Sequence, residues 1–352
     1  MAIEEPYWWY GPRWSWQSVL LAPVASIYGR IAGRRVEQPP TYRSHLPVLC
    51  VGNFTAGGTG KTPLSIALAD MVRELGREPV FLSRGYGGSA HGPLIVDVHT
   101  STAAETGDEP LLLARAAPTV VARDRVAGIQ TIEKKFSGNT VVIMDDGLQN
   151  PALAKSFTIA VVDVMRRFGN GHCLPAGPLR APLTAQLQRA DAIVVNGEAD
   201  AVAESKALAG VTEVFGGLIL RARVAPAGDL KWLNNANVLA YAGIANPGRF
   251  FRLLEAQGAR LIGRRTFSDH HTFTDAEASE LLKDAAAIGA RLVTTEKDFV
   301  RLHGTTGARG ELRGMSMTLP VTAVFPAKDQ AALIQRLAVV LNASPARQGT
   351  QA

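Results

Sequence analysis

The sequence predicts an α/β fold, with a P-loop NTPase-like parallel sheet as its core, a second, smaller α/β domain and an N-terminal interfacial helix. Three observations lead to this fold class. Short β-branched runs alternate with amphipathic stretches from Leu46 onward, a glycine-rich phosphate-binding motif follows the first run, and a second alternating series begins after a turn at residues 225–228. A chain of 352 residues with 47% hydrophobic content has room for one large or two modest globular domains.

Residues 1–36 have the composition of an anchor at a membrane surface. Four of the five tryptophans lie in the first sixteen residues, and aromatic rings favour the lipid headgroup region. An apolar run at residues 19–28 and three arginines within residues 30–35 follow, which suits anionic lipid. The run is about half as long as the roughly 20 residues of a spanning helix, and Pro23 interrupts it, so we expect the segment to lie on the bilayer. The alternative is a helix packed on the protein's own core.

Residues 37–228 are expected to form the P-loop domain, and residues 318–342 to return to it. Short apolar runs with helical stretches between them are typical of a parallel sheet covered by helices. A loop rich in Gly and Pro over residues 169–182 interrupts the alternation, and its length indicates a functional role. The predicted strands are Pro47–Val51, Pro79–Leu82, Thr119–Ala122, Thr140–Met144, Thr158–Val162 and Ala192–Val195.

Residues 229–317 are expected to form the smaller α/β domain, and residues 343–352 a disordered tail. The predicted strands of this domain cover 238–241, 260–264 and 291–294, and its predicted helices cover 247–257 and 275–288. Asn246 is the expected N-cap of the first of these helices, because a proline follows at the first helical position. A strand at 321–324 and a helix at 329–341 would bring the chain back to the first sheet.

The phosphate-binding motif is the segment VGNFTAGGTGKT at residues 51–62. A buried strand runs into a glycine-rich turn and then a helix, so backbone N–H groups and the positive end of the helix dipole converge on phosphate oxygens. Lys61 is expected to reach the β and γ phosphates and to act in catalysis by neutralising charge, and Thr62 to hold a magnesium ion. The match is imperfect, because Thr55 stands where the first glycine of the motif is usual. The expected nucleotide-binding residues are Thr55, Ala56, Gly57, Gly58, Thr59, Gly60, Lys61 and Thr62.

A second apolar strand, at residues 140–144, ends in two carboxylates, Asp145 and Asp146. This is the form of a Walker B strand, whose aspartate approaches the magnesium ion beside a P-loop. A terminal aspartate on a strand is also a common turn former. Both residues are therefore candidate metal ligands, and the sequence does not say which of them binds directly.

The net charge of +6 admits nucleic acid, anionic lipid or a phosphorylated substrate as a partner. The basic residues are scattered and the aromatic residues cluster at the N-terminus, so nucleic acid is not expected as a partner. Only Cys50 and Cys173 are present, which indicates neither a disulfide framework nor a zinc site and favours a reducing compartment.

These features leave an ATPase, a nucleotide switch and a kinase open, because the fold alone does not separate them. A guanine-specific switch carries Asn-Lys-x-Asp near a late strand, whereas TTEKD at residues 294–298 has the aspartate directly after the lysine. The set of motifs, in its order, instead resembles the tetraacyldisaccharide 4'-kinase family over about residues 15–330. The motifs are VGNFTAGGTGKTP from Val51, LSRGYGG from Leu82, GDEP from Gly107, MDDGLQN from Met144, LPAGPLR from Leu174, YAGIANPGRFF from Tyr241, FSDHHTF from Phe267 and TTEKDFVRL from Thr294.

The resemblance implies a kinase that uses ATP and Mg2+. It implies transfer of the γ-phosphoryl group to the 4'-hydroxyl of tetraacyldisaccharide 1-phosphate, an acylated glucosamine disaccharide 1-phosphate, to form lipid IVA in a late step of lipid A biosynthesis. It also implies a peripheral or monotopic place on the cytoplasmic face of the inner membrane. A kinase for another sugar or lipid hydroxyl and a membrane-attached nucleotide switch remain the alternatives.

The resemblance also implies catalytic residues. Asp108 of GDEP matches the family's catalytic aspartate, and His270 of FSDHHTF matches the histidine that pairs with it. A carboxylate backed by an imidazole suits deprotonation of a hydroxyl at neutral pH, and Asp269 is expected to orient the histidine. Asp108 also stands where an N-cap would, and His271 is the alternative to His270. Because Asp108 and His270 lie in different predicted domains, we expect catalysis to need closure of the smaller domain on the larger one.

The sequence departs from the family pattern at two motifs. Many members read DGFQH where this chain has DGLQN, which leaves Gln149 as a candidate metal or water contact and puts Asn150 in place of a histidine. The family's PLREP reads PLRAP, so Ala181 replaces a carboxylate, and water or another ligand would complete a magnesium shell. Arg84 and Arg180 are candidate phosphate contacts, because a guanidinium pairs with two phosphate oxygens.

Overall fold

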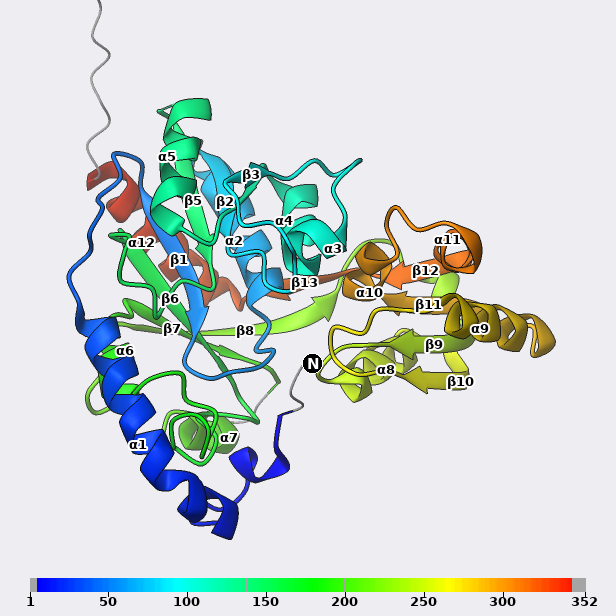
Figure 1. The fold of residues 1–352 in the computed structure, drawn as a ribbon, viewed down its shortest axis with the longest axis horizontal. Coiled ribbons are helices and arrows are strands. Elements are labelled where there is room, and N and C mark those ends of the chain that lie inside the picture. The colour runs from blue at the N-terminus through cyan, green and yellow to red at the C-terminus, as the bar shows by residue number, and fades with distance from the viewer. Residues whose placement is uncertain (1–4, 137, 199–200, 344–352) are drawn as a thin grey trace, which may run out of the picture.

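The computed structural model describes residues 5–136, 138–198 and 201–343, and the strands form two sheets. Within these residues the larger sheet has nine strands in the order β13-β8-β7-β6-β1-β5-β2-β4-β3, and the smaller has four in the order β10-β9-β11-β12. Figure 1 shows the larger sheet with its helices on the left and the smaller sheet with its helices on the right. The predicted α/β fold class is confirmed.

The larger sheet is parallel except at its two edges. Its strands are β1 (Val48–Asn53), β2 (Glu78–Ser83), β3 (Leu94–Ile95), β4 (Thr119–Val121), β5 (Thr140–Asp145), β6 (Phe157–Asp163), β7 (Ala192–Asn196), β8 (Leu218–Pro226) and β13 (Val321–Val324). β1 pairs in parallel with β5 on one side and β6 on the other, whereas β3 and β13 are antiparallel to their neighbours. The chain builds β2, β4 and β5 on one side of β1 and then β6, β7 and β8 on the other. The carboxyl end of β1 is therefore the usual place for a ligand in such a sheet.

Helices cover both faces of this sheet. They are α2 (Lys61–Glu74), α3 (Ala103–Thr106), α4 (Asp108–Ala116), α5 (Arg125–Lys135), α6 (Leu183–Leu187), α7 (Ala201–Ala207) and α12 (Ala327–Ala343). Leu49 and Val51 of β1 lie in one core cluster with residues of α2 and α12. Val48 and Cys50 face the other way and lie in a cluster with residues of α5. Because both faces are buried, the central strands are apolar at nearly every position, which made them easy to predict.

The smaller sheet is parallel throughout and is also covered by helices. Its strands are β9 (Asn237–Ala242), β10 (Arg260–Thr266), β11 (Arg291–Thr295) and β12 (Ser316–Leu319), and the helices of this part are η2 (Lys231–Leu233), α8 (Pro247–Ala256), α9 (Asp275–Ala287), α10 (Glu296–Arg301) and α11 (Gly307–Met315). Asn246 Oδ1 accepts a hydrogen bond from Arg249 N at 3.1 Å, which confirms Asn246 as the N-cap of α8. From β12 the chain passes through Pro320 into β13, which pairs with β8, so the C-terminal segment returns to the larger sheet as expected.

The predicted strands and helices are confirmed, with ends that differ by a few residues. The prediction missed β8, because its buried and partly exposed positions alternate and it contains arginines, so it lacks a continuous apolar run. β8 extends to Pro226, so the turn expected at residues 225–228 begins later than predicted. Ala343 is the last residue of α12, and the rest of the expected tail lies outside the described residues. The division of the chain into domains stays a prediction.

The N-terminal segment is a 3-10 helix, η1 (Tyr7–Tyr10), followed by helix α1 (Trp16–Glu37). The interruption expected at Pro23 is wrong, because α1 continues through this residue. Proline inside a helix removes one backbone hydrogen bond, and packing against the rest of the protein holds α1 together here. Figure 1 shows α1 along the outer side of the larger sheet. Of the helices in the described ranges, none combines the length and apolar character needed to cross a membrane.

Helix α1 has small residues on the side that faces the protein and large apolar residues on its outer side. Gly29 and Gly33 approach Cys173 and Pro182 so closely that an added Cβ would lie 3.2 and 3.3 Å from their side chains. The exposed large apolar residues of α1 are Trp16, Val19, Leu20, Val24, Ile27, Tyr28 and Ile31. Trp9 was expected to be exposed with the other N-terminal aromatic residues, but it is buried. Its Nε1 donates to Pro175 O at 3.0 Å.

Candidate active site

The phosphate-binding loop joins β1 to α2 at the carboxyl edge of the larger sheet, where the sequence predicts it. Contacts from two later segments hold the loop. Ala56 N donates to Pro178 O at 2.8 Å, and Asn196 Nδ2 donates to Thr59 O at 2.8 Å. Gly60 has a φ of 86°, a conformation that favours glycine, and it turns the chain into α2. Free N–H groups at the start of a helix such as α2 suit an anion, so the loop has the form expected for phosphate binding.

Lys61 begins α2 and is 8% exposed. Its Nζ donates to Asn53 Oδ1 at 3.3 Å and lies 3.8 Å from Asp146 Oδ1. In the same loop, the buried Oγ1 of Thr59 has no hydrogen-bond partner among the described residues. Because an unpaired buried polar atom costs free energy, a hydroxyl of this kind beside a phosphate-binding loop fits a bound phosphate oxygen.

Asp145 and Asp146 lie at the carboxyl end of β5 and differ in their charge environment. Burial first, and then the carboxylate of Glu109, raise the pKa of Asp145 to about 7. Burial acts in the same direction on Asp146, but Lys61 and Arg180 outweigh it and hold the pKa of this carboxyl well below its usual range. Arg180 Nη1 donates to both carboxylate oxygens of Asp146, at 2.7 and 2.8 Å. Asp146 is thus paired with an arginine, whereas in the part of the chain that the structure describes Asp145 forms no ion pair.

The residues predicted to hold magnesium fit a site with few protein ligands; they are Thr62, Asp145, Asp146 and Gln149. No group of three or more His, Cys, Asp or Glu side chains within the described ranges is placed to hold a metal ion. Magnesium in kinase sites usually takes one or two carboxylates, and water and substrate phosphates supply its other ligands. Thr62 directly follows Lys61, and Asp145, whose Oδ1 accepts from Ser65 Oγ at 3.1 Å, is the carboxylate left without an ion pair among the described residues.

Gln149 and the residues at the two departures from the family pattern are held by contacts within the protein. Gln149 Nε2 donates to Asn53 O at 2.7 Å and to Gln186 Oε1 at 2.6 Å, so its amide nitrogen braces the end of β1. The Oδ1 of Asn150 accepts from a backbone N–H two residues later at 2.9 Å, as turn-forming asparagines do. Ala181 is 0% exposed, so its side chain is enclosed by protein.

The second half of the site joins the two sheets. Asp108 is the first residue of α4 and is 4% exposed, and His270 lies in the loop between β10 and α9. The Nδ1 atom of His270 is 3.1 Å from Asp108 Oδ2. These two residues are thus in contact without the domain closure expected from the sequence. His270 has a φ of 57°, an uncommon conformation for histidine that occurs more often at functional sites.

The charges around this pair define which atom of His270 is free. Burial raises the pKa of Asp108, but the hydrogen bond from His270 and the charges of Lys297 and Arg301 hold it well below its usual range. The hydrogen bond to Asp108 raises the pKa of His270 above its ordinary value, against the effect of burial. An ionised carboxylate only accepts hydrogen bonds, so Nδ1 donates and Nε2 is the free nitrogen. Asp269 Oδ2 lies 3.9 Å from Nε2, too far for a hydrogen bond, and its Oδ1 accepts instead from His270 N at 3.0 Å.

Two basic residues of α10 complete this half of the site, and neither was predicted from the sequence. Arg301 Nε donates to Asp108 Oδ2 at 2.9 Å, and Arg301 Nη1 donates to Asp298 Oδ1 at 2.7 Å. The Nζ atom of Lys297 donates to Glu109 Oε1 at 2.6 Å. Both belong to the TTEKDFVRL motif, and residues four apart share one face of a helix. This spacing is the signal that could have identified them.

The loop after β2 lies beside His270. The rings of Tyr86 and His270 have centroids 5.7 Å apart, in an edge-on arrangement. Arg84 is exposed, and within the described residues its guanidinium forms neither a hydrogen bond nor an ion pair, so it is free to meet a ligand. Its role as a phosphate contact stays a prediction, as does that of Arg180.

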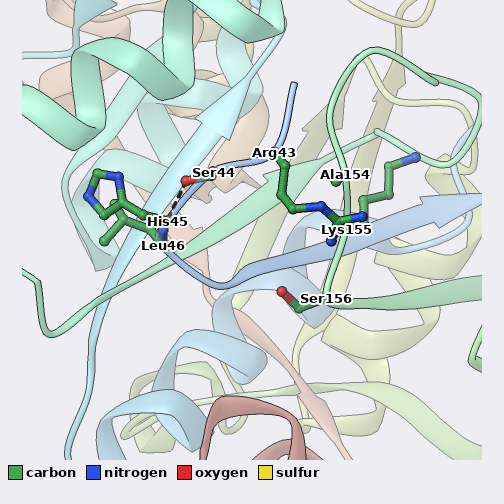
Figure 2. A pocket seen from close by; sticks show the side chains of 7 residues that line it. All are labelled: Arg43, Ser44, His45, Leu46, Ala154, Lys155 and Ser156. Atoms are coloured by element: carbon green, nitrogen blue, oxygen red, sulfur yellow. Dashed lines mark hydrogen bonds between the residues drawn. The ribbon is translucent and has the colours of Figure 1, made fainter. Parts of the chain in front are cut away.

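A separate hollow lies at the amino ends of β1 and β6 (Figure 2). Its lining residues are Arg43, Ser44, His45, Leu46, Ala154, Lys155 and Ser156. Lys155 Nζ donates to Leu148 O at 3.2 Å and to Asn150 O at 2.8 Å, so this ammonium holds the chain that follows β5. None of the predicted site residues lines this hollow, and the active site lies at the other end of the strands.

The two halves of the site are neighbours, because the charge of Glu109, the residue after Asp108, acts on the pKa of Asp145. A glycine-rich loop of the P-loop form at the carboxyl edge of a parallel sheet, with an aspartate and histidine pair, is the arrangement expected of a P-loop kinase. A family model described as tetraacyldisaccharide-1-P 4'-kinase, LpxK, matches residues 17–341. The chain belongs to this family, as its motifs predicted, and it is a lipid A 4'-kinase.

Individual relatives agree with the family model. Proteins named tetraacyldisaccharide 4'-kinase from Rhodopseudomonas palustris (strain BisB18) and Methylobacterium sp. (strain 4-46) are 48% and 47% identical to this chain. The first match covers 86% of each protein, and the second covers 95% of this chain and 97% of the relative. A crystal structure of LpxK from Aquifex aeolicus in complex with ATP, 24% identical, has the same fold, with a TM-score of 0.69 over 91% of this chain and 99% of that one.

Proposed function

We propose that the protein transfers the γ-phosphoryl group of ATP to the 4'-hydroxyl of tetraacyldisaccharide 1-phosphate, which forms lipid IVA. The observation that carries this proposal is the 3.1 Å contact between His270 and Asp108 beside the phosphate-binding loop. An imidazole held in this way would serve as a base for a hydroxyl, near groups suited to a nucleotide. The family description supplies the acceptor, and ATP is the ligand in the Aquifex structure.

The nucleotide half would bind phosphates through residues 55–62. The N–H groups of the loop, the Thr59 hydroxyl and Lys61 Nζ are donors for phosphate oxygens, and Lys61 would stabilise the charge of the transferring group. Thr62 and Asp145 would hold magnesium directly, with Asp146 and Gln149 as further predicted contacts to the metal or its water. When bound, magnesium neutralises charge on the phosphate oxygens during transfer.

The acceptor half would take the proton of the sugar hydroxyl on His270 Nε2. A general base works best when its pKa lies near the operating pH, which suits an imidazole better than a carboxylate bonded to a guanidinium. Asp108 would hold the imidazole with Nδ1 protonated and stabilise the positive charge that the ring gains. Asp269 would support the loop through the backbone of His270.

We further propose that α1 lies on the cytoplasmic face of the inner membrane as a peripheral or monotopic anchor, where the acylated disaccharide resides. The support is the arrangement of α1, whose large apolar residues face outward while its glycines face the protein. Apolar residues on an outer face suit lipid and not water. The exposed Arg30, Arg34 and Arg35 near the end of α1 suit anionic headgroups.

Transfer of labelled γ-phosphate to tetraacyldisaccharide 1-phosphate in detergent micelles tests the reaction. We expect labelling of the lipid that requires magnesium, and no labelling of the same disaccharide when its 4' position already carries phosphate. A preparation that binds ATP but labels no acylated disaccharide would contradict the proposed acceptor. It would favour a different hydroxyl acceptor or a nucleotide switch.

Flotation with vesicles that contain anionic lipid tests the membrane role. Val24 on α1 and Val339 on α12 are both 56% exposed and both helical, so Val24→Glu and Val339→Glu are a matched pair. Loss of one buried apolar side chain should lower binding of the Val24 variant about tenfold. The Val339 variant should bind like the unchanged protein. Equal binding of both variants would remove α1 from the contact with lipid.

A further inference from the structure

Arg301 bonds to groups from three segments of the chain, and its side chain is only 7% exposed. Its Nε and Nη2 atoms both donate to Asp108 Oδ2, the first at 2.9 Å. Its Nη1 atom donates to Gly243 O at 2.6 Å and to Asp298 Oδ1 at 2.7 Å. A planar guanidinium with several donors in fixed directions holds a carboxylate in one orientation, which a flexible ammonium does not.

Asp298 holds the guanidinium from its other side. The carboxylate of Asp298 is 0% exposed, and its Oδ2 accepts from Gly243 N at 3.0 Å and from Thr295 Oγ1 at 2.6 Å. A buried and fully bonded carboxylate is costly to move. Arg301 is therefore anchored on α10, beside the smaller sheet, while its guanidinium reaches Asp108 of α4.

Arg301 and His270 share one oxygen of Asp108. Oδ2 accepts from both residues, and Oδ1 accepts from Glu109 N at 2.9 Å. The carboxylate cannot turn its other oxygen toward His270 without breaking the bonds to Arg301. The orientation of the imidazole therefore depends on Arg301 through Asp108.

We propose that Arg301 is a positioning residue for phosphoryl transfer: it holds Asp108 from α10, so that Asp108 keeps the imidazole of His270 in the orientation that receives the acceptor's proton. The reaction named here rests on the proposed function, whereas the effect of Arg301 on His270 does not. Misplacement of a catalytic group by about 1 Å lowers turnover by up to about 10²-fold. Replacement of Arg301 should therefore lower kcat more than it weakens the binding of substrates.

Kinetics of Arg301→Lys and Arg309→Gln test this role. Lysine keeps the positive charge and loses the fork, and Arg309, which forms a partly exposed ion pair with Asp275 at 3.2 Å, is a matched arginine away from the site. Arg301→Lys should lower kcat about 10- to 100-fold, with KM for ATP and for the lipid within about twofold of the unchanged protein. The Arg309 variant should keep its kcat. An unchanged kcat in Arg301→Lys, or a loss expressed only in KM, would overturn the proposal.

Titration of His270 tests the role without a substrate. The groups that face its imidazole are Asp108 from α4, Arg301 from α10, Asp269 from its own loop and the neutral ring of Tyr86. Loss of the nearby positive charge in Arg301→Gln should raise the pH at which His270 is half protonated, while Arg301→Lys should leave it near that of the unchanged protein.

This titration is followed by NMR of histidine-labelled protein, with His270→Gln to assign the signal. An unmoved midpoint in folded Arg301→Gln would overturn the proposal, and if that variant does not fold, the kinetic result with Arg301→Lys decides. If the unchanged protein transfers no phosphate to tetraacyldisaccharide 1-phosphate, the proposed function fails. The NMR titration still reports whether Arg301 acts on His270.

Discussion

The two halves of the active site are built in different ways. The phosphate-binding half consists mainly of consecutive residues, 55–62, between one strand and one helix. In the acceptor half, Asp108 and His270 are 162 residues apart, and Arg301 is a further 31 residues along the chain. The first half follows from a local chain conformation, whereas the second exists only because the two sheets dock. Changes in the second half should therefore remove turnover and leave nucleotide binding intact.

The largest expected effect comes from replacing His270, which tests whether turnover and ATP binding depend on separate halves of the site. We expect His270→Gln to lower kcat about 10²- to 10⁴-fold, the usual contribution of a general base, because glutamine does not accept a proton at Nε2. ATP affinity, measured by calorimetry, should stay the same. The neighbouring His271, which bonds Glu277 at 3.0 Å, supplies the control, and His271→Gln should keep its activity. A loss of ATP affinity in the His270 variant would show that the halves are not separable.

A change in the first half should affect both steps. We expect Lys61→Ala to lower kcat about 10²- to 10³-fold, because the transferring phosphoryl loses a preorganised cation, and also to weaken ATP binding. Lys206→Ala on the exposed side of α7 is the control and should be neutral. Rate assays and calorimetry on the same preparations measure both effects. Unchanged ATP affinity in Lys61→Ala would place this lysine outside the nucleotide site.

The pH dependence should contain a contribution from His270 in addition to that of Asp145, whose pKa is about 7. Asp108 raises the pKa of His270 above its ordinary value of 6.5, and only the neutral imidazole accepts a proton. Turnover should thus fall about tenfold for each pH unit below that raised pKa. The free energy of unfolding should have the opposite trend. Protonated His270 contributes its full stabilisation below about pH 6.5, and this stabilisation is lost as the pH rises through the pKa of His270 in the folded state.

Rate profiles and thermal melting as functions of pH measure these two trends. His270→Gln is the control, because it has no titrating group at this position. If the acid limb of the rate profile stays unchanged in this variant, a different group is the base.

The smallest expected effect concerns a contact that supports the first half. Asn196 Nδ2 donates to Thr59 O at 2.8 Å, from the end of β7. Loss of one such hydrogen bond is worth about 1 kcal/mol, so Asn196→Ala should raise the dissociation constant for ATP about fivefold. The titration midpoint of His270 should not move. A shift in that midpoint would mean that the two halves are coupled through the loop.

Several features follow from the sequence because they depend on neighbours in the chain. Leu49 and Val51 alternate with Val48 and Cys50 in a strand that is buried on both faces, so its apolar run is visible. The glycines and Lys61 of the loop, and the N-cap at Asn246, also depend on local geometry. The sequence by itself determined the α/β class, the glycine-rich loop between β1 and α2 and, through its motifs, the family.

Other features were decided only by the tertiary structure. Trp9 belongs to an aromatic cluster in the sequence, yet it is buried, because the loop at residues 169–182 packs over it. α1 continues through Pro23, because packing of its small residues outweighs one lost hydrogen bond. The attachment of Arg301 to Asp108 joins residues that are 193 positions apart. Such a contact depends on how two separately formed sheets pack together, which no local pattern of residues specifies.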